Sequence, residues 1–455
     1  MMKVAKFGGS SVADASMIQK VAQIIRSDQD RKFIIVSAPG KRSKTDIKVT
    51  DLLVELGKKH EANEAVDDVK AKIIERFQTM INNLALSSAI VDDIKDTIDG
   101  VLYDESLKDN RLDSLKAMGE DSLAKVLSAY LQSLGEEATY INPRDAGIIV
   151  SDEPGNAQVL DESYEKIYRL RDHKGIMIIP GFFGFTKDQK LMTFPRGGSD
   201  ITGAIIAAGI KADLYENFTD VDSVYCVNPN IVENPKEISE LTYKEMRELS
   251  YAGFSVFQDE ALIPAFKAKI PVCIKNTNNP EKEGTMIVSD RKNPITGTVV
   301  GIASDKGFLS LYVSKYLMNR EIGFGKNLLQ ILVDEGISFE HAPSGIDDMS
   351  VIIRKDEFPK EKEQVVIKRI QEELDVDMVT VERDLAMIML VGEGMNSTYG
   401  VASQSTQAFA NASVNIEMIN QGSSEVSVMF GIKEDELEKA VQSLYHVFFE
   451  NKIKV

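Results

Sequence analysis

One glycine pair near the start of the chain has the composition of a phosphate-binding turn. Residues 3–11 read KVAKFGGSS, so that Lys6 precedes Gly8, Gly9 and Ser10 at the end of a short apolar segment. A glycine-rich turn between a strand and a helix offers unshielded N–H groups and the positive end of a helix dipole. A tight turn with no ligand uses the same residues, and the signature G-x-x-x-x-G-K-[ST] is absent because the lysine comes first.

A second glycine pair repeats the pattern with a different cation. Residues 195–200 read PRGGSD, with Arg196 before the glycines and Ser199 and Asp200 after them. A planar guanidinium suits a two-pronged grip on a carboxylate or phosphate, and Ser199 stands where a helix N-cap is expected. Two such turns at neighbouring strand ends of one sheet would suit a nucleotide and an anionic acceptor.

Three weaker features carry acids and hydroxyls. Residues 217–225 read NFTDVDSVY and place Thr219, Asp220 and Asp222 at a strand end. They could hold the ribose or base edge of a nucleotide, although the same residues also form simple Asx turns. Glu120 is expected to open a helix, where a carboxylate favours the dipole, and Thr50 is expected to cap one.

The elements that must position these residues alternate between strand and helix. Strands are expected at 3–7 and 32–38 with a crossover helix at 16–27, and a charged helical stretch over 51–135 reads as an insertion. Strand and helix patterns then alternate again to about residue 295. The alternation predicts an α/β fold with a mostly parallel, helix-covered sheet.

The last third of the chain contains a repeat. Residues 337–353 align without a gap on 414–430 at an offset of 77. Matching pairs include Glu340 with Glu417, Gly345 with Gly422, Asp348 with Glu425, Ser350 with Ser427, and Val351 with Val428. Helices are expected around the two copies at 325–336, 359–374, 403–413 and 434–449. The order predicts two ferredoxin-like modules, the alternative being a chance match of amphipathic strands.

Composition limits the classes of function. The 455 residues carry 53 Lys and Arg against 71 Asp and Glu, a net charge of −18 that argues against nucleic acid or an anionic membrane as partner. Cys226 and Cys273 suggest no disulfide framework, and no signal peptide or membrane-spanning run is apparent, so we expect a cytoplasmic protein. Four histidines without HExxH or paired CxxC argue against a zinc site.

The motifs KFGGSS, PRGGSDITG and NFTDVDSVY, with the C-terminal repeat, together resemble the aspartate kinases. The resemblance covers essentially the whole chain in the family's order and implies the amino-acid kinase fold followed by two ACT domains. The implied domains are a catalytic domain over 1–295, a first ACT domain over 300–378 and a second over 379–455. No dinucleotide-binding domain follows, so the chain resembles the monofunctional, lysine-sensitive type.

The resemblance implies a nucleotide side of the site. Lys6 would neutralise the transferring γ-phosphoryl group and Asp200 would orient that lysine, these two being the catalytic residues. The remaining implied ATP contacts are the N–H groups of Gly8, Gly9 and Ser10 with Thr219, Asp220 and Tyr225. Asn230 and Asn278 stand where some relatives carry a basic phosphate contact, and Lys275 is the candidate to replace it.

The resemblance also implies an acceptor side. Arg196 would hold a carboxylate of L-aspartate, and Glu120 would contact its ammonium group. The other implied aspartate contacts are Thr50, Gly197, Gly198 and Ser199. The reaction would be phosphorylation of the β-carboxylate of L-aspartate to 4-phospho-L-aspartate, the first step of lysine, threonine and methionine biosynthesis.

No general base is needed because a carboxylate is already ionised at pH 7, and catalysis would rest on positioning and positive charge. Mg²⁺ would be carried with ATP on the phosphates, with no dedicated metal ligands in the protein.

The repeat also has a candidate effector site. Met318 and Phe324 could form apolar walls and Gly323 could present N–H groups to a carboxylate, while acids in the first copy suit a ligand with an extra positive charge. The acids are Glu340, Asp347 and Asp348. In lysine-sensitive relatives the matching positions line the lysine pocket, so lysine is the first choice and threonine the second. Solvated loop acids are the alternative.

We expect a homodimer or homotetramer formed through the ACT domains, because an isolated sheet edge is a liability.

Two rival functions remain open. One is another amino-acid kinase acting on glutamate or N-acetylglutamate, against which the repeat and the helical insertion argue. The other is an amino-acid sensor without turnover, against which the retention of Lys6, Arg196 and Asp200 argues.

Overall fold

The computed structural model describes residues 1–254, 259–291, 298–422 and 426–450. These fall into two compact units, which we describe separately. The N-terminal unit comprises Met1–Val224, Glu237–Met246 and Val256–Lys292, and the C-terminal unit comprises Tyr225–Lys236, Arg247–Ser255 and Asn293–Val455. The expected catalytic-domain end at residue 295 falls outside the described residues.

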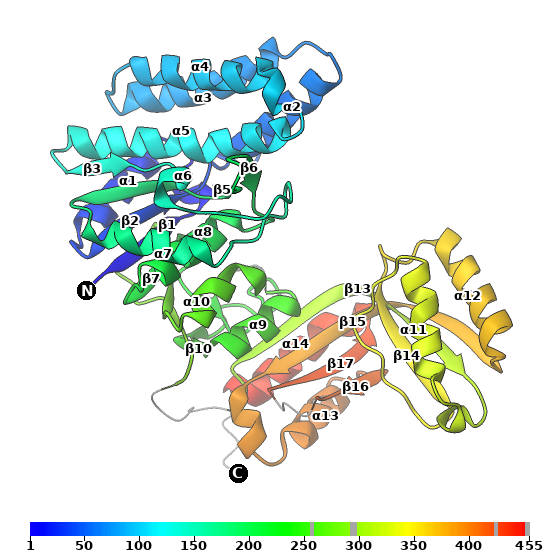
Figure 1. Ribbon diagram of the computed structural model, residues 1–455. Helices are drawn as coiled ribbons and strands as arrows, with labels where there is room; N and C mark the ends of the chain where they lie inside the picture. The colour runs from blue at the N-terminus through cyan, green and yellow to red at the C-terminus, as the bar shows by residue number, and fades with distance from the viewer. Residues whose placement is uncertain (255–258, 292–297, 423–425, 451–455) are drawn as a thin grey trace. The chain divides into compact units, whose positions relative to one another are not determined.

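The N-terminal unit is built on an eight-stranded sheet with the order β10-β12-β11-β7-β1-β2-β4-β3 (Figure 1). All its neighbouring strands run parallel except the antiparallel pair β11 and β12. The strands of this unit are β1 (Lys3–Phe7), β2 (Arg31–Val36), β3 (Ala138–Tyr140), β4 (Ile176–Pro180), β5 (Phe183–Phe185), β6 (Leu191–Thr193), β7 (Leu214–Thr219), β9 (Glu237–Ile238), β10 (Glu240–Thr242), β11 (Val272–Asn276) and β12 (Thr285–Val288), with β8 (Val224–Tyr225) at its boundary. The expected mostly parallel sheet is confirmed.

The helices of this unit lie against the sheet or, in the helical insertion, in a layer outside it (Figure 1). They are α1 (Ala15–Arg26), α2 (Val49–Glu61), α3 (Asp67–Asn83), α4 (Ala89–Tyr103), α5 (Arg111–Ser133), α6 (Pro143–Ala146), α7 (Glu162–Tyr168), α8 (Gly198–Gly209) and α10 (Ile263–Lys267), with α9 (Tyr243–Tyr251) at the unit boundary. Helix α1 begins where the sequence favours it, because the side chain of Asp14 accepts a hydrogen bond from the Met17 N–H at 3.0 Å.

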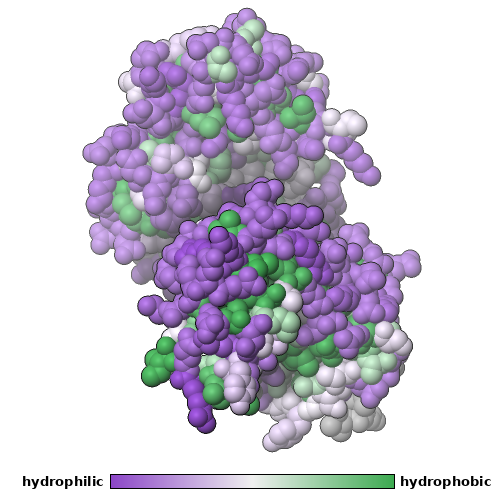
Figure 2. Space-filling model, turned by 90° about the vertical axis from the view of Figure 1, so that its right-hand side faces the viewer, coloured by the Kyte–Doolittle hydropathy of each residue, from purple (hydrophilic) through white to green (hydrophobic). Residues whose placement is uncertain are grey.

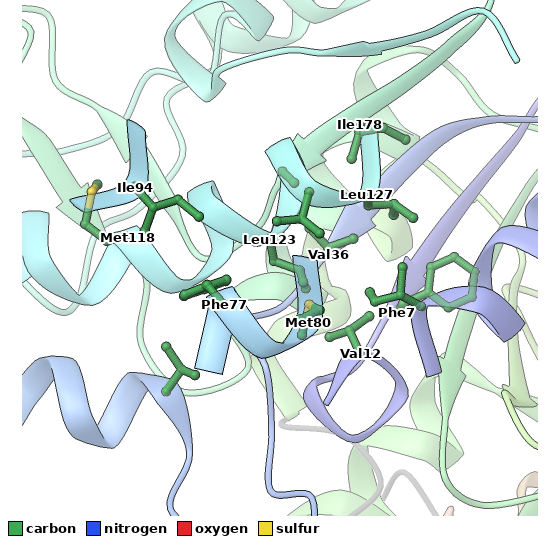
Figure 3. Close-up of a cluster of buried hydrophobic side chains, with 14 of the residues drawn as sticks. Phe7, Val12, Val36, Phe77, Met80, Ile94, Met118, Leu123, Leu127 and Ile178 are labelled. Atoms are coloured by element: carbon green, nitrogen blue, oxygen red, sulfur yellow. The ribbon is translucent and has the colours of Figure 1, made fainter. Parts of the chain in front are cut away.

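The helical insertion forms a layer of its own, α2 to α5. Helix α5 is its base, because it carries apolar side chains toward the sheet and toward the outer helices α3 and α4 (Figure 3). Leu123 and Leu127 lie near Phe7 and Val36 of the sheet, and Phe77 of α3 belongs to the same cluster. All five side chains are buried, so one continuous core joins the insertion to the sheet.

The C-terminal unit has a five-stranded sheet with the order β14-β13-β15-β17-β16. Its strands are β13 (Gly301–Ser314), β14 (Asp348–Arg354), β15 (Met378–Val391), β16 (Met418–Asn420) and β17 (Ser427–Lys433). Its helices are α11 (Phe324–Asp334), α12 (Lys360–Leu374), α13 (Val401–Asn411) and α14 (Leu437–Tyr445). All pairs in this sheet are antiparallel, as expected of ferredoxin-like modules.

The two modules share their long strands. β13 and β15 pair along their whole length, but the ladder breaks near Gly307 (φ 86°) and Asp384 (φ 58°). Beyond the break, residues 308–314 pair with β14 and with the first half of β15, which makes the first module. Before it, residues 301–306 pair with the second half of β15, which also pairs with β17 and makes the second module.

The expected domain boundary between residues 378 and 379 does not describe this shared strand pairing. The first residues of the expected first ACT domain, 301–306, supply an edge strand to the second module. Glu425, one position of the sequence repeat, lies outside the described residues. No helix in the described part of the chain is long and apolar enough to cross a membrane.

Candidate active site

Three of the predicted site residues, Lys6, Thr219 and Lys275, lie near one edge of the N-terminal sheet. Strands β1, β7 and β11 are parallel neighbours, so their carboxyl ends at Phe7, Thr219 and Asn276 lie at the same edge. Strand β1 also pairs with β2, whose end at Val36 is opposite Phe7. This is the edge at which open α/β sheets bind ligands.

Lys6 and Asp200 form the ionic centre of this edge. Lys6 Nζ lies 2.6 Å from Asp200 Oδ1, and the two side chains are 8% and 19% exposed. Asn217 of β7 donates to the same carboxylate oxygen at 2.5 Å. The predicted partnership of Lys6 and Asp200 thus joins the end of β1 to the first turn of α8.

The first glycine turn lies directly after this lysine. The Gly8 N–H donates to the Phe218 carbonyl oxygen at 3.0 Å, so this predicted phosphate donor is already engaged within the fold. Gly9 and Ser10 begin a short 3-10 helix (Gly9–Val12), whose first N–H groups have no partner within the helix. The predicted helix dipole at this turn therefore belongs to the short helix, since α1 begins only at Ala15.

The segment after β2 backs this turn, and sequence reasoning did not single it out. The Gly40 N–H donates to the Gly9 carbonyl oxygen at 2.9 Å. A Cβ on Gly40 would lie 2.6 Å from the Gly9 carbonyl carbon, so only glycine fits this approach. Residues 36–40 read VSAPG, so a third strand end is followed by a glycine. This pattern could have identified the segment from the sequence.

Glu120 is buried in the same region. It is 5% exposed and lies in the middle of α5, not at a helix start as expected. Burial raises the pKa of Glu120 to about 8, against the lowering effects of the Ala38 N–H and of Lys6. Its Oε2 has no hydrogen-bond partner among the described residues. A buried carboxyl with a free oxygen can receive a ligand's donor group.

The second glycine turn begins α8. Gly197 is its N-cap with φ 77°, a left-handed conformation that favours glycine, and the helix starts at Gly198. Ser199 is therefore inside the first turn and is not the cap that the sequence suggested. A Cβ on Gly181, after β4, would meet the Ser199 side chain at 2.7 Å, which shows how closely α8 packs on the sheet.

Arg196 is exposed just before this turn. The strand that leads to it, β6, is held by Asp113 of α5, a buried residue that sequence reasoning missed. Asp113 Oδ2 accepts hydrogen bonds from the Thr193 N–H and Thr193 Oγ1 at 2.8 and 2.9 Å, and from the Gly155 N–H at 2.8 Å. Helix α5 thus carries Glu120 and also fixes the approach to Arg196.

Thr50 is partly buried in the first turn of α2. The structure does not support its expected role as helix cap, because the N-cap is Lys48 and no side chain caps this helix. Its predicted contact with the amino-acid substrate stays a prediction.

The predicted nucleotide contacts occupy the ends of β7 and β11. Thr219 ends β7 and donates to Asp220 Oδ1 at 3.2 Å. Asp222 instead accepts a hydrogen bond from Asn276 Nδ2 at 2.6 Å and pairs with Lys282 Nζ at 2.7 Å. These two contacts give Asp222 a structural role: it joins the segment after β7 to the end of β11 and to Lys282.

Lys275 lies in β11 opposite Phe218. Asn278 accepts a hydrogen bond from Lys20 Nζ at 3.0 Å, so a cation does reach this position, from α1. Tyr225 ends β8 and Asn230 follows in the segment assigned to the C-terminal unit. Their nucleotide roles stay predictions.

The predicted effector residues lie in the first module in two environments. Met318 and Phe324 are 7% and 3% exposed and belong to the module's core, and Gly323 (φ 90°) is the N-cap of α11. Asp347 accepts a hydrogen bond from the Leu317 N–H at 2.9 Å, which ties the two loops together. Asp348 begins β14.

Glu340 is already engaged. It accepts a hydrogen bond from Arg354 Nε at 2.9 Å and one from the hydroxyl of Tyr251, at the end of α9. Arg354 also binds Asp305 at 2.9 Å. A ligand that used Glu340 would have to replace or join these contacts.

Comparison with known proteins agrees with this geometry. Residues 1–276 match the amino acid kinase family, and residues 388–448 match the ACT domain. The chain is 57% identical to Aspartokinase 3 of Bacillus subtilis (strain 168) over 449 residues, with 98% of this chain and 99% of that protein covered.

Solved structures of aspartate kinases have the same fold. The crystal structure of Clostridium acetobutylicum aspartate kinase, described as an allosteric enzyme, matches with a TM-score of 0.88 and 38% identity, covering 98% of this chain and 100% of that one. E. coli aspartokinase III in complex with lysine and aspartate shares the fold, with a TM-score of 0.74 and 24% identity over 98% and 99% of the chains. This chain belongs to the amino acid kinase family and, within it, to the aspartokinases.

Proposed function

We propose that this chain transfers the γ-phosphoryl group of ATP to the β-carboxylate of L-aspartate at the carboxyl edge of its N-terminal sheet. The observation that carries the proposal is the ion pair between the buried Lys6 and the partly buried Asp200, which lies between two glycine turns. One turn has free backbone donors for a phosphate, and the other follows an exposed arginine suited to a carboxylate. The two turns give the nucleotide and the acceptor separate cradles around one fixed cation.

On the nucleotide side, Lys6 stabilises the charge that develops on the transferring phosphoryl group, and Asp200 holds the lysine in place. The N–H groups of Gly9 and Ser10 bind phosphate oxygens, and Thr219 and Asp220 face the nucleoside. Preorganised positive charge of this kind supplies much of the catalysis in phosphoryl transfer.

Mg²⁺ would enter with ATP. Among the described residues no cluster of three or more His, Cys, Asp and Glu could hold a metal ion by itself. The phosphates supply the hard oxygen ligands that Mg²⁺ prefers, so the protein's share is small. The ion, when bound, neutralises phosphate charge, and Lys6 adds a second positive charge.

On the acceptor side, Arg196 grips the α-carboxylate of aspartate and Glu120 receives its ammonium group. The unpartnered Oε2 of Glu120 supports this role, because an ammonium would satisfy a buried oxygen that the fold leaves open. The β-carboxylate is ionised at neutral pH and attacks directly, so no proton has to be removed.

The test is aspartate-dependent formation of ADP by the full chain, with hydroxylamine added to trap the acyl phosphate as a hydroxamate. Turnover with L-aspartate but not with L-glutamate or N-acetyl-L-glutamate supports the proposal. ADP formation with either of the latter would favour the rival kinases. Binding of aspartate without any ADP would favour an amino-acid sensor.

We also propose that the ACT modules bind an amino-acid effector, with lysine the first candidate and threonine the second. Asp348 supports a ligand with an extra positive charge, and such a ligand would have to join or replace the hydrogen bonds that Glu340 and Asp347 already accept. Inhibition assays with lysine, threonine and both together decide among the candidates. An enzyme indifferent to all three conditions would exclude this regulation.

The C-terminal unit further supports a homodimer or homotetramer through its first module. Large apolar side chains are exposed there, with Ile322 at 101%, Tyr316 at 74% and Ile346 at 69%. Figure 2 shows apolar residues grouped among hydrophilic ones on the lower part of the face that it displays. Several large apolar side chains exposed in one module are typical of protein interfaces.

A cytoplasmic location completes the proposal. Both cysteines are free and buried, and burial raises the pKa of the Cys273 thiol to about 11, so it has little thiolate character. Two unpaired thiols are what a reducing compartment allows.

A further inference from the structure

A buried arginine of the helical insertion reaches the back of the phosphate turn. Arg76 of α3 is 6% exposed, and its guanidinium makes four hydrogen bonds within the described part of the chain. Nη2 donates to the carbonyl oxygens of Gly40 at 2.8 Å and Ala13 at 3.3 Å. Nη1 donates to Asp46 Oδ2 at 2.8 Å and to the Ile47 carbonyl oxygen at 3.0 Å.

The acceptors come from both sides of the turn. Ala13 follows the short helix Gly9–Val12, and Gly40 belongs to the segment that backs Gly9. Asp46 is held in turn by Arg42, whose guanidinium binds it at 2.9 and 3.0 Å, and this contact keeps the pKa of Asp46 well below its usual range. Arg76 therefore meets a carboxylate that stays ionised.

The contact between Gly40 and Gly9 links Arg76 to the N–H groups that we expect to bind phosphate, because Arg76 binds the Gly40 carbonyl oxygen. The Gly40 N–H bonds to the Gly9 carbonyl oxygen at 2.9 Å, and a Cβ on Gly40 would lie 2.9 Å from the Ser10 nitrogen. A shift of Gly40 must therefore move the peptide that carries the predicted donors Gly9 and Ser10. Small displacements of this size are costly in phosphoryl transfer, because catalysis depends on position.

We propose that Arg76 is a positioning residue for the nucleotide: it fixes the phosphate turn through Gly40 and Ala13, and so makes the helical insertion part of the ATP site. The proposal rests on the proposed function, since it takes the turn Gly8–Ser11 as the phosphate cradle. The guanidinium fork is essential, because Arg76 donates to four acceptors from two nitrogens, whereas a lysine has three N–H donors on a single nitrogen.

A purely structural anchor is the alternative, and the chain offers a matched control for it. Arg31 is 8% exposed and also makes four hydrogen bonds, two to Glu216 and one each to the Ile24 carbonyl and Ser27. It begins β2, at the strand end opposite to the site. Arg31→Lys therefore removes a similar buried fork that makes no hydrogen bond to the residues described for the phosphate turn, and whose guanidinium carbon lies 5.4 Å from the centroid of the Phe218 ring.

The experiment compares steady-state kinetics and melting temperature of Arg76→Lys, Gly40→Ala and Arg31→Lys in the full chain. Arg76→Lys should raise the KM for ATP or lower kcat, together by about tenfold or more, with the KM for aspartate changed less than about twofold. Gly40→Ala should give the same split, because it displaces the turn while leaving Arg76 intact. Arg31→Lys should lower the melting temperature with both KM values near wild type.

Four outcomes separate the possibilities. A folded Arg76→Lys with wild-type kinetics would overturn the proposal, as would equal losses for ATP and aspartate. If Arg76→Lys does not fold, Gly40→Ala alone decides, and a normal KM for ATP and kcat there would overturn the proposal. A wild-type chain without aspartate-dependent ADP formation would instead reject the proposed function itself.

Discussion

Lys6 Nζ and Asp200 Oδ1 are 2.6 Å apart although 194 positions separate the residues, and Asn217 donates to the same oxygen. Strand β1 supplies the lysine, and the first turn of α8 supplies the carboxylate. The pair fixes a cation at the sheet edge before any ligand binds. Such preorganisation avoids the reorganisation that water would need around a developing charge.

Replacement of Lys6 by alanine should therefore lower kcat by about 10²-fold or more, as loss of a transition-state electrostatic contact does. Lys3→Ala is the matched control, because Lys3 lies in the same strand and pairs with Asp28 at 2.6 Å, away from the site. Steady-state kinetics and circular dichroism of both variants make the comparison. Near-normal turnover of Lys6→Ala would remove Lys6 from the mechanism.

Arg196→Lys should raise the KM for aspartate more than the KM for ATP. Lysine keeps the charge but loses the two parallel donors that match a carboxylate. We expect about a tenfold rise, on the scale of one charge-assisted hydrogen bond. Arg169→Lys, another exposed arginine, is the control and should leave both constants unchanged. Equal rises for both substrates would contradict a specific carboxylate grip.

Much of this site could be predicted because its residues lie in the last residues of strands or just after them. Lys6, Thr219 and Lys275 lie at strand ends, and parallel pairing brings such ends to one edge whatever their separation in sequence. Arg76 and Asp113 could not be found in this way. They act through side chains that cross from another element, and periodicity says nothing about which partner they reach.

Local helix signals were less reliable. Thr50 and Ser199 have cap-forming side chains, yet Lys48 and Gly197 are the caps, because packing of α2 and α8 decides where each helix begins. Glu120 looked like a first-turn acid because the 23-residue length of α5 was not apparent.

The sequence repeat predicted two modules but not their register. The Glu340 N–H bonds to the Ile352 carbonyl, whereas the Glu417 N–H bonds to that of Gly431, two residues beyond the position that an offset of 77 requires. A shift of two residues keeps every side chain on its face, so the hydrophobic pattern cannot detect it.

The buried Glu120 should make stability depend on pH. Its pKa is about 8 in the folded, ligand-free chain against 4.5 in the unfolded one. Between these values the folded state holds a proton that the unfolded state has lost, so this group lowers stability as pH rises from about 5 to 8. The melting temperature of Glu120→Gln, relative to wild type, should therefore increase over that range.

The same substitution should weaken aspartate binding. Only the ionised carboxylate attracts an ammonium, so the wild-type KM for aspartate should fall between pH 6.5 and 8.5, while Glu120→Gln should keep a high, flat KM. Glu61→Gln, exposed at the end of α2, is the control for both measurements. A melting-temperature difference equal at pH 5 and pH 8 would mean that Glu120 is already ionised without ligand.

Charge placed on the exposed apolar surface of the first module should separate the subunits. Ile322 and Ile346 are 101% and 69% exposed, and their loops are joined by the Asn319 N–H, which donates to the Ile346 carbonyl at 3.1 Å. Burial of an isoleucine contributes about 1.5–3 kcal/mol, and symmetry counts each side chain twice in a dimer. The double variant Ile322→Asp with Ile346→Asp should therefore shift the mass measured by light scattering toward the monomer. Tyr399→Asp, 93% exposed in the second module, should keep the wild-type mass. If the double variant also keeps it, the subunits meet through another surface.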